Sequence, residues 1–229
     1  MNTLLRIIDF ETTGFEPPAE VIEVGMADLH GDLSIVLGPS YLCHADEVPA
    51  ESRAIHHIWP EDLVGLPKFD PRVEIDRAHR DGVRAFVAHN AEFEQRWMGD
   101  EIPFICTYKA SLRMLEFAPT HTNFGLAYFL MDNGLISIER KLMTPSHRSL
   151  PDATVTAHLL RLLISEGATV EQLVQWTKEP RLLPTCPIGK WRGSPWSEVD
   201  LGFLEWVLGK DFDDDVKWNV RNEIANRNS

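Results

Sequence analysis

Apolar and polar positions alternate along most of this chain with the periods of strands and helices. Five short, mainly apolar runs predict β-strands: residues 4–8, 21–27, 34–37, 83–88 and 102–106. From residue 49 onward, helical spacing of apolar residues appears, and it predicts helices over residues 91–98, 108–116, 123–133, 151–165 and 170–178. The early strands form a meander, and later strands and helices alternate. This order predicts an α/β fold, with a mixed sheet of about five strands flanked by helices.

The last fifth of the chain differs in composition from the rest. Three prolines between residues 180 and 187 predict a connector, because proline does not fit the interior of a helix. We therefore expect one domain over residues 1–180 and a small C-terminal module over residues 185–229. Four of the seven tryptophans lie in this module, too many apolar anchors for a disordered tail: Trp191, Trp196, Trp206 and Trp218. The acidic run at residues 211–215 predicts a solvated loop.

Length and composition are those of an ordinary globular protein. With 229 residues, 44% of them hydrophobic, the chain can bury one sizeable core. No apolar run reaches the roughly 18 residues that a membrane-spanning helix needs, and the N-terminal residues lack the order of a signal peptide. We therefore expect a cytoplasmic protein with no membrane partner. Only three cysteines occur, far apart and without CxxC spacing, which predicts reduced structural thiols and neither a disulfide framework nor a zinc site.

The net charge of −13 argues against a protein that coats nucleic acid by general electrostatics, since phosphate binding depends mainly on Lys and Arg. Acidic residues that hold divalent cations can nevertheless attract phosphate locally, because the cations are then the largest charges in the site. A metal site would therefore soften the objection from composition. Five basic residues along the later helices could supply phosphate contacts, or equally be scattered solvated charges: Lys109, Arg113, Arg140, Lys141 and Arg148.

Asp9 and Glu11 stand two residues apart at the end of the first predicted strand. Because side chains alternate along a strand with a period of two, both carboxylates lie on the same side of the sheet. Neighbouring carboxylates repel one another, and a hard divalent cation gives both a reason to stay ionised. The pattern therefore indicates a metal site, although an isolated Asp-x-Glu is more often a solvated pair at a strand end.

Three spaced blocks of polar residues follow one another along the chain. They are residues 9–14 (Asp-Phe-Glu-Thr-Thr-Gly), 89–94 (His-Asn-Ala-Glu-Phe-Glu) and 147–152 (His-Arg-Ser-Leu-Pro-Asp). Together they resemble the three motifs of the DEDDh exonuclease superfamily, which includes the proofreading subunit of bacterial DNA polymerase III and ribonuclease T. Within that superfamily the chain most resembles the exodeoxyribonuclease X type, over nearly its whole length. The likeness also covers three further segments: residues 54–58, 105–107 and 189–193.

This resemblance implies a ribonuclease H-like fold and a 3′→5′ exonuclease that releases nucleoside 5′-monophosphates from DNA 3′ ends, single-stranded or at a duplex end, in repair or end processing. It implies that four acids hold two divalent cations, Mg²⁺ or Mn²⁺: Asp9, Glu11, Glu94 and Asp152. Two such cations can clamp the scissile phosphate. His147 is implied as the general base, a role that suits histidine because it ordinarily titrates near neutrality.

Two of these acids have alternative interpretations. The second motif of the family normally ends in Asp, so Glu94 is longer by one methylene, and metal preference or rate should differ. Glu92 is the fallback ligand, but Phe93 fills the apolar position of the motif only if Glu94 takes the acidic one. Asp152 beside Pro151 could also stabilise a helix start without binding metal, because negative charge interacts favourably with the helix dipole there.

The resemblance also implies a pocket for the terminal nucleotide. Its expected members are Thr12, Thr13, Gly14, Phe15, His56, Asn90 and Phe93. Gly14 permits close approach of the backbone, and Phe15 can stack on or wedge against a base. Each of three residues has a structural alternative. Phe15 could equally belong to the core, Asn90 could cap a helix, and Phe93 could be buried.

Three functions remain open from the sequence. The expected one is a DNA exonuclease. An exoribonuclease of the same superfamily is the alternative, because rejection of ribose depends on a pocket that the sequence does not reveal. The third is a catalytically weakened nucleic-acid-binding module that recruits partners through the Trp-rich tail. In that case Glu94, in place of the usual Asp, would reflect the loss of catalytic function. The other acids and His147 are intact, which counts against it. The oligomeric state and the pathway are not predicted.

Overall fold

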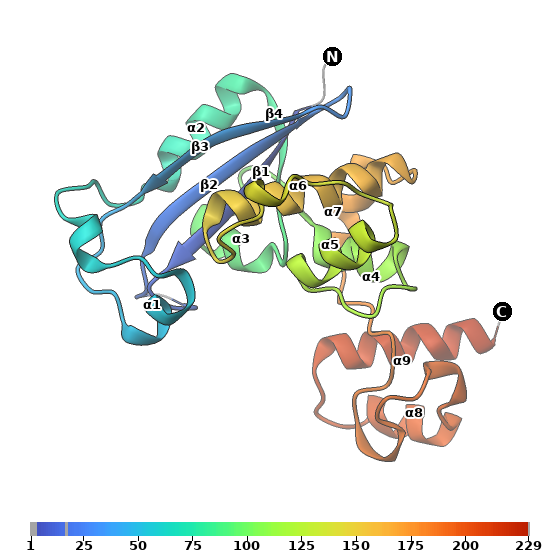
Figure 1. Cartoon of the computed structure of the whole chain (residues 1–229). Helices are drawn as coiled ribbons and strands as arrows, with labels where there is room; N and C mark the ends of the chain where they lie inside the picture. Colours follow the sequence, from blue (N-terminus) through green and yellow to red (C-terminus); the bar gives the residue numbers. More distant parts are fainter. Residues whose placement is uncertain (1–3, 17, 229) are drawn as a thin grey trace.

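The computed structural model describes residues 4–16 and 18–228, and the strands in these ranges form one mixed sheet of five (Figure 1). Residues 1–3, 17 and 229, which belong to the two predicted parts of the chain, lie outside the described residues. The strands are β1 (Leu4–Thr12), β2 (Val21–His30), β3 (Ile35–Leu42), β4 (Val83–Ala88) and β5 (Phe104–Cys106), in the order β3-β2-β1-β4-β5. β1, β2 and β3 pair antiparallel, whereas β4 and β5 extend the sheet in parallel. The predicted α/β fold is confirmed.

Helices flank the sheet and form the C-terminal module, drawn in orange and red (Figure 1). The α-helices are α1 (Ala50–His56), α2 (Pro71–Asp81), α3 (Glu92–Met98), α4 (Thr107–Met114), α5 (Asn123–Asp132), α6 (Ser149–Ser165), α7 (Val170–Lys178), α8 (Leu201–Leu208) and α9 (Asp214–Arg227). The 3-10 turns are η1 (Pro60–Leu63), η2 (Arg140–Leu142), η3 (Gly189–Trp191) and η4 (Trp196–Glu198). The predicted helices are confirmed with slightly shifted ends. Helix α6 begins before Pro151, because the Asp152 amide already donates to the Arg148 carbonyl at 3.1 Å.

Alternation of side chains along β1 divides the core into two layers. Leu5 and Ile7 face α4, α5, α6 and α7, while Phe10 faces α2 and α3. Asp9 and Glu11 continue the row of Leu5 and Ile7, as the period of two predicted. Helix α6 packs across β1 and β2 on this side (Figure 1), so both acids lie on the face of the sheet that this helix covers.

Gly25 of β2 allows the start of α6 to lie against the sheet. It is the partner of Asp9 in the β1–β2 ladder, and a Cβ atom at Gly25 would lie 2.2 Å from the carbonyl carbon of Ser149. Any side chain at this position would push the helix away from the sheet. The close approach brings the first turn of α6, which carries Asp152, over the end of β1.

The C-terminal module packs around a core of its own. Its buried members are Cys186, Trp196, Val199, Leu204, Val207, Val216 and Val220. Trp191 is half-buried against this core, whereas Trp206 is 48% exposed. The prediction of a solvated loop over residues 211–215 is wrong in its second half. Asp213 caps α9, and Asp215 lies in the first turn of that helix, because their carboxylates satisfy free amides and basic groups near its N-terminus.

Arg113 of α4 ties the module to the sheet domain. Its guanidinium lies between the rings of Trp176 and Trp218, 5.8 and 5.6 Å from their centres, and donates to Glu179 at 3.0 Å. Lys109 donates to the backbone carbonyl of Glu179 at 2.6 Å. Both basic residues therefore have structural partners at the junction, and neither is a scattered solvated charge.

The three cysteines lie in the interior of the protein. All three cysteines are buried free thiols. Cys43 and Cys106 pack in the layer beneath α2 and α3, and Cys186 packs in the core of the module. Among the described residues, no helix combines the length and the apolar character that crossing a membrane would require.

Candidate active site

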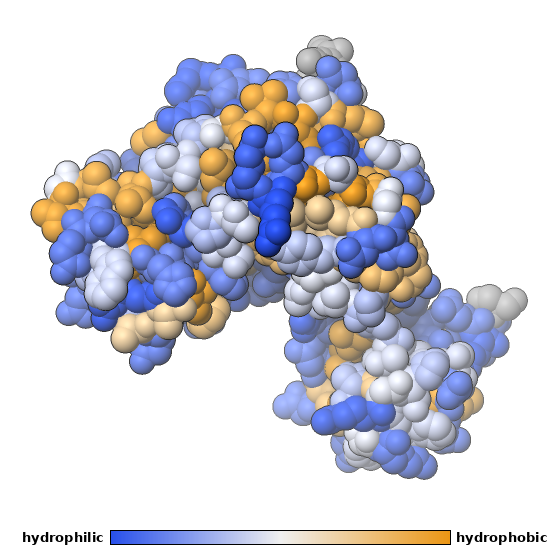
Figure 2. Space-filling model, in the orientation of Figure 1, coloured by the Kyte–Doolittle hydropathy of each residue, from blue (hydrophilic) through white to orange (hydrophobic). Residues whose placement is uncertain are grey.

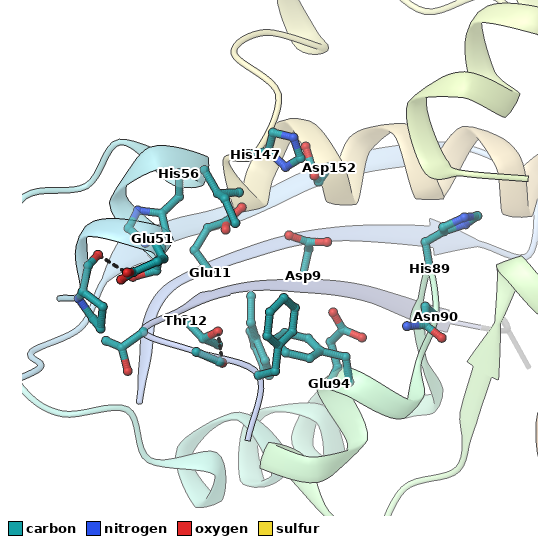
Figure 3. Close-up of a pocket in the computed structure, with 18 residues that line it drawn as sticks. Asp9, Glu11, Thr12, Glu51, His56, His89, Asn90, Glu94, His147 and Asp152 are labelled. Carbon is teal, nitrogen blue, oxygen red and sulfur yellow. Dashed lines mark hydrogen bonds between the residues drawn. The ribbon is translucent and has the colours of Figure 1, made fainter. Parts of the chain in front are cut away.

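One cleft at the end of β1 gathers the residues that the sequence analysis assigned to chemistry (Figure 3). It has a volume of about 520 Å³ and is lined by α1, α3, the loop after β1 and the first turn of α6. This volume is ordinary for a ligand site, roughly 300–1,000 Å³. Every predicted site residue lines it: Asp9, Glu11, Thr12, Thr13, Gly14, Phe15, His56, Asn90, Phe93, Glu94, His147 and Asp152.

Three carboxylates meet in this cleft. Asp9 and Glu11 lie on β1 and Asp152 lies on α6, and one oxygen of each is within 4.8 Å of the others. Figure 3 shows Asp152 above Asp9 and Glu11 to one side of both, with the three side chains turned toward a common space. The Oδ1 atom of Asp152 is buried and has no hydrogen-bond partner among the described residues. A buried acceptor of this kind is unfavourable unless a ligand satisfies it.

Burial and mutual repulsion raise the pKa values of these acids. Burial is the first cause for each, and the pKa of Glu11 rises to about 8 and that of Asp152 to about 7. The pKa of Asp9 is raised well above its ordinary value, first by burial and then by repulsion from Asp152 and Glu94. The backbone amide of His147 opposes the rise at Asp152. Without a cation, the cleft therefore favours protonated carboxyl groups near neutral pH.

Glu94 of α3 also faces Asp9, but from the side opposite to Asp152 (Figure 3). It is not part of the group whose oxygens lie within 4.8 Å of one another. Glu94 is 4% exposed, its Oε2 atom has no hydrogen-bond partner in the described chain, and burial raises its pKa to about 8. The fallback Glu92 is exposed and pairs with Arg96 at 3.4 Å, outside the cleft. Of the two glutamates, Glu94 is therefore the one that faces the acids.

His147 lies at the edge of the cleft beside Asp152 (Figure 3). It is exposed, and its backbone adopts a left-handed conformation with φ of 58°. Residues other than glycine seldom adopt this conformation, and those that do are concentrated at functional sites. The imidazole is thus open to solvent next to the acids, where a proton acceptor can reach a water molecule.

Glu23 of β2 holds the start of α6 and is missing from the predicted site. It is 3% exposed and accepts hydrogen bonds from Arg148 at 2.9 Å and from the Ser149 amide at 3.0 Å. Because the donors are the first and second residues after His147, the carboxylate fixes the segment that carries the histidine. The sequence did contain a signal for this residue, since Glu23 is the single charged position in the apolar run 21–27.

The loop after β1 is shaped by its own hydroxyl groups. Thr12 Oγ1 donates to the Gly14 carbonyl at 2.6 Å, and Thr13 Oγ1 accepts from the Glu20 amide at 2.8 Å. The two threonines therefore support the loop from within. Phe15 is 77% exposed on this loop, so the core alternative for Phe15 is wrong. An exposed aromatic ring at the cleft can stack on or wedge against a base.

Three further predicted residues line the cleft and differ in burial and in hydrogen bonding. His56 is 1% exposed, and its Nδ1 accepts from the Ile58 amide at 3.0 Å, so the proton belongs on Nε2, which has no partner among the described residues. Asn90 is exposed with φ of 71°, and α3 has no side-chain cap, so the helix-cap alternative is wrong. Phe93 is half-buried, with its ring edge-on to Trp97.

The fold and the cleft are those of a nuclease. The chain belongs to the exonuclease (RNase T) family, whose model matches residues 7–160. It is 33% identical to exodeoxyribonuclease 10 of Escherichia coli (strain K12) over 218 residues, which cover 90% of each chain. Exonuclease X in complex with 5′ overhanging duplex DNA is 30% identical, with a TM-score of 0.61 over 76% of this chain and 99% of that one. E. coli exonuclease I in complex with a dT13 oligonucleotide, 12% identical with a TM-score of 0.54 over 70% of this chain and 41% of that one, is alike in fold alone.

Proposed function

We propose that this chain is a two-metal-ion 3′→5′ exonuclease that hydrolyses DNA from 3′ ends and releases nucleoside 5′-monophosphates, in DNA repair or end processing. The observation that carries the proposal is the meeting of Asp9, Glu11 and Asp152 in one cleft, with a buried oxygen that lacks a partner in the described chain. Family membership and the named activity of the E. coli relative support it. We assign catalysis to residues 1–180 and treat residues 185–229 as a separate module.

The cleft suits hard divalent cations. Its candidate ligands are carboxylate oxygens, the donors that Mg²⁺ and Mn²⁺ prefer. Burial and then repulsion between the acids raise their pKa values, and a bound positive charge would offset both effects. Asp9, Glu11 and Asp152 would hold the cations, with Glu94 as the fourth acid. Two cations supply Lewis acidity, which lowers the pKa of the attacking water and stabilises the leaving 3′ oxygen.

Other side chains of the cleft would accept the proton of the attacking water and bind the terminal nucleotide. His147 would accept the proton of the attacking water at an imidazole nitrogen. Glu23, through Arg148, would keep that imidazole beside Asp152. His56 would donate from Nε2 to the nucleotide, because this N–H group is buried at the cleft without a partner in the described chain.

The choice of DNA rests on the relatives and on the loop after β1. Exodeoxyribonuclease 10 is named for DNA, and the solved exonuclease X structure contains a 5′ overhanging duplex. Phe15, exposed on the loop, would stack on or wedge against the base nearest the cleft. Asn90 is exposed and lines the same cleft, and its side-chain amide would hydrogen-bond to the nucleotide.

Degradation of end-labelled oligonucleotides tests direction, sugar and metal together. DNA labelled at either end and RNA of the same sequence are incubated with Mg²⁺, Mn²⁺ or EDTA, for wild type and Asp9→Ala. We expect 5′-labelled DNA to shorten stepwise from its 3′ end and only with metal. Asp9→Ala should slow this reaction at least about a hundredfold, because it removes a charge that acts on the transition state.

Each other result has a defined meaning. Faster degradation of RNA than of DNA would replace the DNA substrate by exoribonuclease activity. Cleavage that persists in EDTA would contradict the role of cations. Binding without cleavage under every condition would favour a catalytically weakened nucleic-acid-binding module.

A further inference from the structure

The C-terminal module carries a row of aromatic and lysine side chains that the proposed catalysis does not use, in which Trp206 and the lysines are exposed and the two phenylalanines are half-buried. Trp206 is 48% exposed and stacks on Phe203, with ring centres 5.5 Å apart and 29° between the ring planes. Phe212 meets Trp206 edge-on at 5.8 Å, and the Lys210 ammonium lies 5.8 Å from the centre of the Trp206 ring. We call Phe203, Trp206, Lys210 and Phe212, together with Lys190, the aromatic–lysine strip.

The Gly-Lys-Trp segment that begins at Gly189 is built against this strip. Gly189 has φ of 60°, and a Cβ atom there would lie 3.2 Å from the Phe203 ring, so glycine lets the loop approach the ring. Lys190 follows directly, and its ammonium lies 5.3 Å from the centre of the Trp191 ring. The segment therefore places a second lysine directly after the residue that approaches the Phe203 ring of α8.

Most of the positive charge on the module has no acidic partner within the described chain, although the whole chain has a net charge of −13. Most Lys and Arg residues before residue 185 form ion pairs, whereas in the described part of the module only Arg227 does. Lys190 and Lys210 have ring contacts instead, which are weak at exposed sites. The face of the module in Figure 2 is pale and hydrophilic, with little strongly hydrophobic surface. Both ammonium groups are therefore free to move to a phosphate.

We propose that the aromatic–lysine strip binds single-stranded nucleic acid, as a second contact for the strand whose 3′ end lies in the cleft. Bases stack on aromatic rings whatever their sequence, and ammonium groups pair with the phosphates between them. A base takes the face of Trp206 that Lys210 covers, and the ammonium moves to the adjoining phosphate. The inference rests on the proposed exonuclease function, because it concerns the same strand.

Charge and position favour a single strand over a duplex. The exposed acids Glu205 and Asp211 adjoin the strip in sequence and would repel the dense charge of a duplex, whereas a flexible strand can turn its phosphates toward the lysines. Arg113 fixes the module to the sheet domain, so cleft and strip can act on one strand as a bivalent site. The match to E. coli exodeoxyribonuclease 10 covers 90% of this chain and thus continues into the module.

Binding of labelled single-stranded DNA to the full chain tests the proposal, in the Asp9→Ala background and with Mg²⁺. One probe has about 30 nucleotides, more than the roughly 4–16 that one binding fold covers, and the other has about three. The test variants are Trp206→Ala and Lys210→Glu, the second of which leaves the aromatic packing intact. The controls are Tyr128→Ala, a half-exposed aromatic residue of α5, and Arg80→Glu, an exposed basic residue of α2 without an ion pair in the described chain.

We expect Trp206→Ala to bind the long probe about tenfold more weakly, as the loss of one stacked base predicts. Lys210→Glu should weaken this binding to a similar extent, because it replaces a phosphate contact by a negative charge that repels the strand. The controls should bind the long probe like the parent. The short probe should not distinguish any of the proteins. Unchanged binding of the long probe by both strip variants overturns the proposal, and so does an equal loss for both probes. A change in self-association by sedimentation, with DNA affinity unchanged, would assign the strip to a second copy of the chain. Failure of the proposed function would appear separately, as absence of metal-dependent hydrolysis when Asp9 is intact.

Discussion

The junction between sheet domain and module buries polar side chains, as the cleft does, but the junction satisfies them. Asn219 of α9 accepts from the Leu183 amide at 2.9 Å and donates to the Arg181 carbonyl at 2.7 Å. Asp215 accepts from the Arg181 amide at 2.7 Å and pairs with the guanidinium of the same residue. These contacts fasten the connector to α9, and each polar atom in them has its partner within the protein.

The cleft leaves comparable groups without partners. Oδ1 of Asp152, Oε2 of Glu94 and Nε2 of His56 are buried and unpaired among the described residues. Such a group costs about 1–3 kcal/mol, so its presence indicates a ligand, whereas a satisfied network indicates stability. The difference teaches that burial of a polar group does not by itself mark a functional site. Missing partners mark one when several gather in the same cleft, because single unpaired atoms such as Nη1 of Arg6 and Nε1 of Trp191 are also buried elsewhere in the described chain.

Glu23 offers the strongest challenge to this comparison, because it is a satisfied acid that lies next to the cleft. Glu23→Gln removes the charge that holds Arg148, and we expect the rate or the metal affinity to fall about 10–100-fold, as for other outer partners of metal ligands. The measurements are the Mg²⁺ concentration for half-maximal rate and the pH profile of the rate. Glu74→Gln is the matched control, since Glu74 is 1% exposed and accepts from Tyr41 at 2.7 Å and Arg77 at 2.9 Å, outside the cleft. Equal losses of activity in the two variants would mean that Glu23 acts through stability alone.

The second test uses the raised pKa values of the metal-free cleft. The folded protein keeps protons on Glu11 and Glu94 up to about pH 8 and on Asp152 up to about pH 7, whereas the unfolded chain releases them near 4.5 and 3.8. The stability that these protons contribute is complete below the unfolded values and is lost as pH rises through the folded ones. In EDTA we therefore expect Tm to fall by several degrees from about pH 5 to about pH 8. Mg²⁺ or Mn²⁺ should restore it at the higher pH, and a flat profile without response to cations would contradict both the pKa shifts and the metal site.

Substitutions at the junction should have the opposite effect, because they should lower the stability of the fold without changing the rate of hydrolysis. Asn219→Ala leaves the Leu183 amide and the Arg181 carbonyl without their partner and should lower the free energy of unfolding by about 1–3 kcal/mol. Denaturant unfolding measures this change, and Asn222→Ala, an exposed position on the same helix, is the control. Hydrolysis of a short oligonucleotide should stay at the wild-type rate. A loss of that activity would show that the junction contributes to the cleft.

The smallest expected effect is at Glu94, the unpaired acid that lies outside the group of three. If Glu94 is a ligand displaced by its extra methylene, Glu94→Asp should keep or raise the Mg²⁺-dependent rate, whereas Glu94→Ala should lower it. Steady-state hydrolysis with Mg²⁺ and with Mn²⁺ measures both variants. Complete indifference to both substitutions would remove Glu94 from the ligand set.

Much of the fold could be predicted because it depends on local pattern. The period of two along β1 placed Asp9 and Glu11 on one face, and each of the three motif blocks contributes side chains to the same cleft. Local pattern could not decide whether Phe15 is in the core or exposed, because exposure depends on which segments cover the loop. It also could not place α8 and α9, whose apolar residues were visible only as a group of tryptophans.

The sequence by itself determined the order of the strands and of the helices between residues 91 and 178, the shared face of Asp9 and Glu11, and the identity of the acids, because these follow from residue type and short spacing. The tertiary structure alone decided which buried groups find partners. Glu23 meets Arg148 across 125 positions of the chain, and Arg113 lies between two tryptophans from different helices. Such contacts depend on how distant segments pack together, and no local period contains that information.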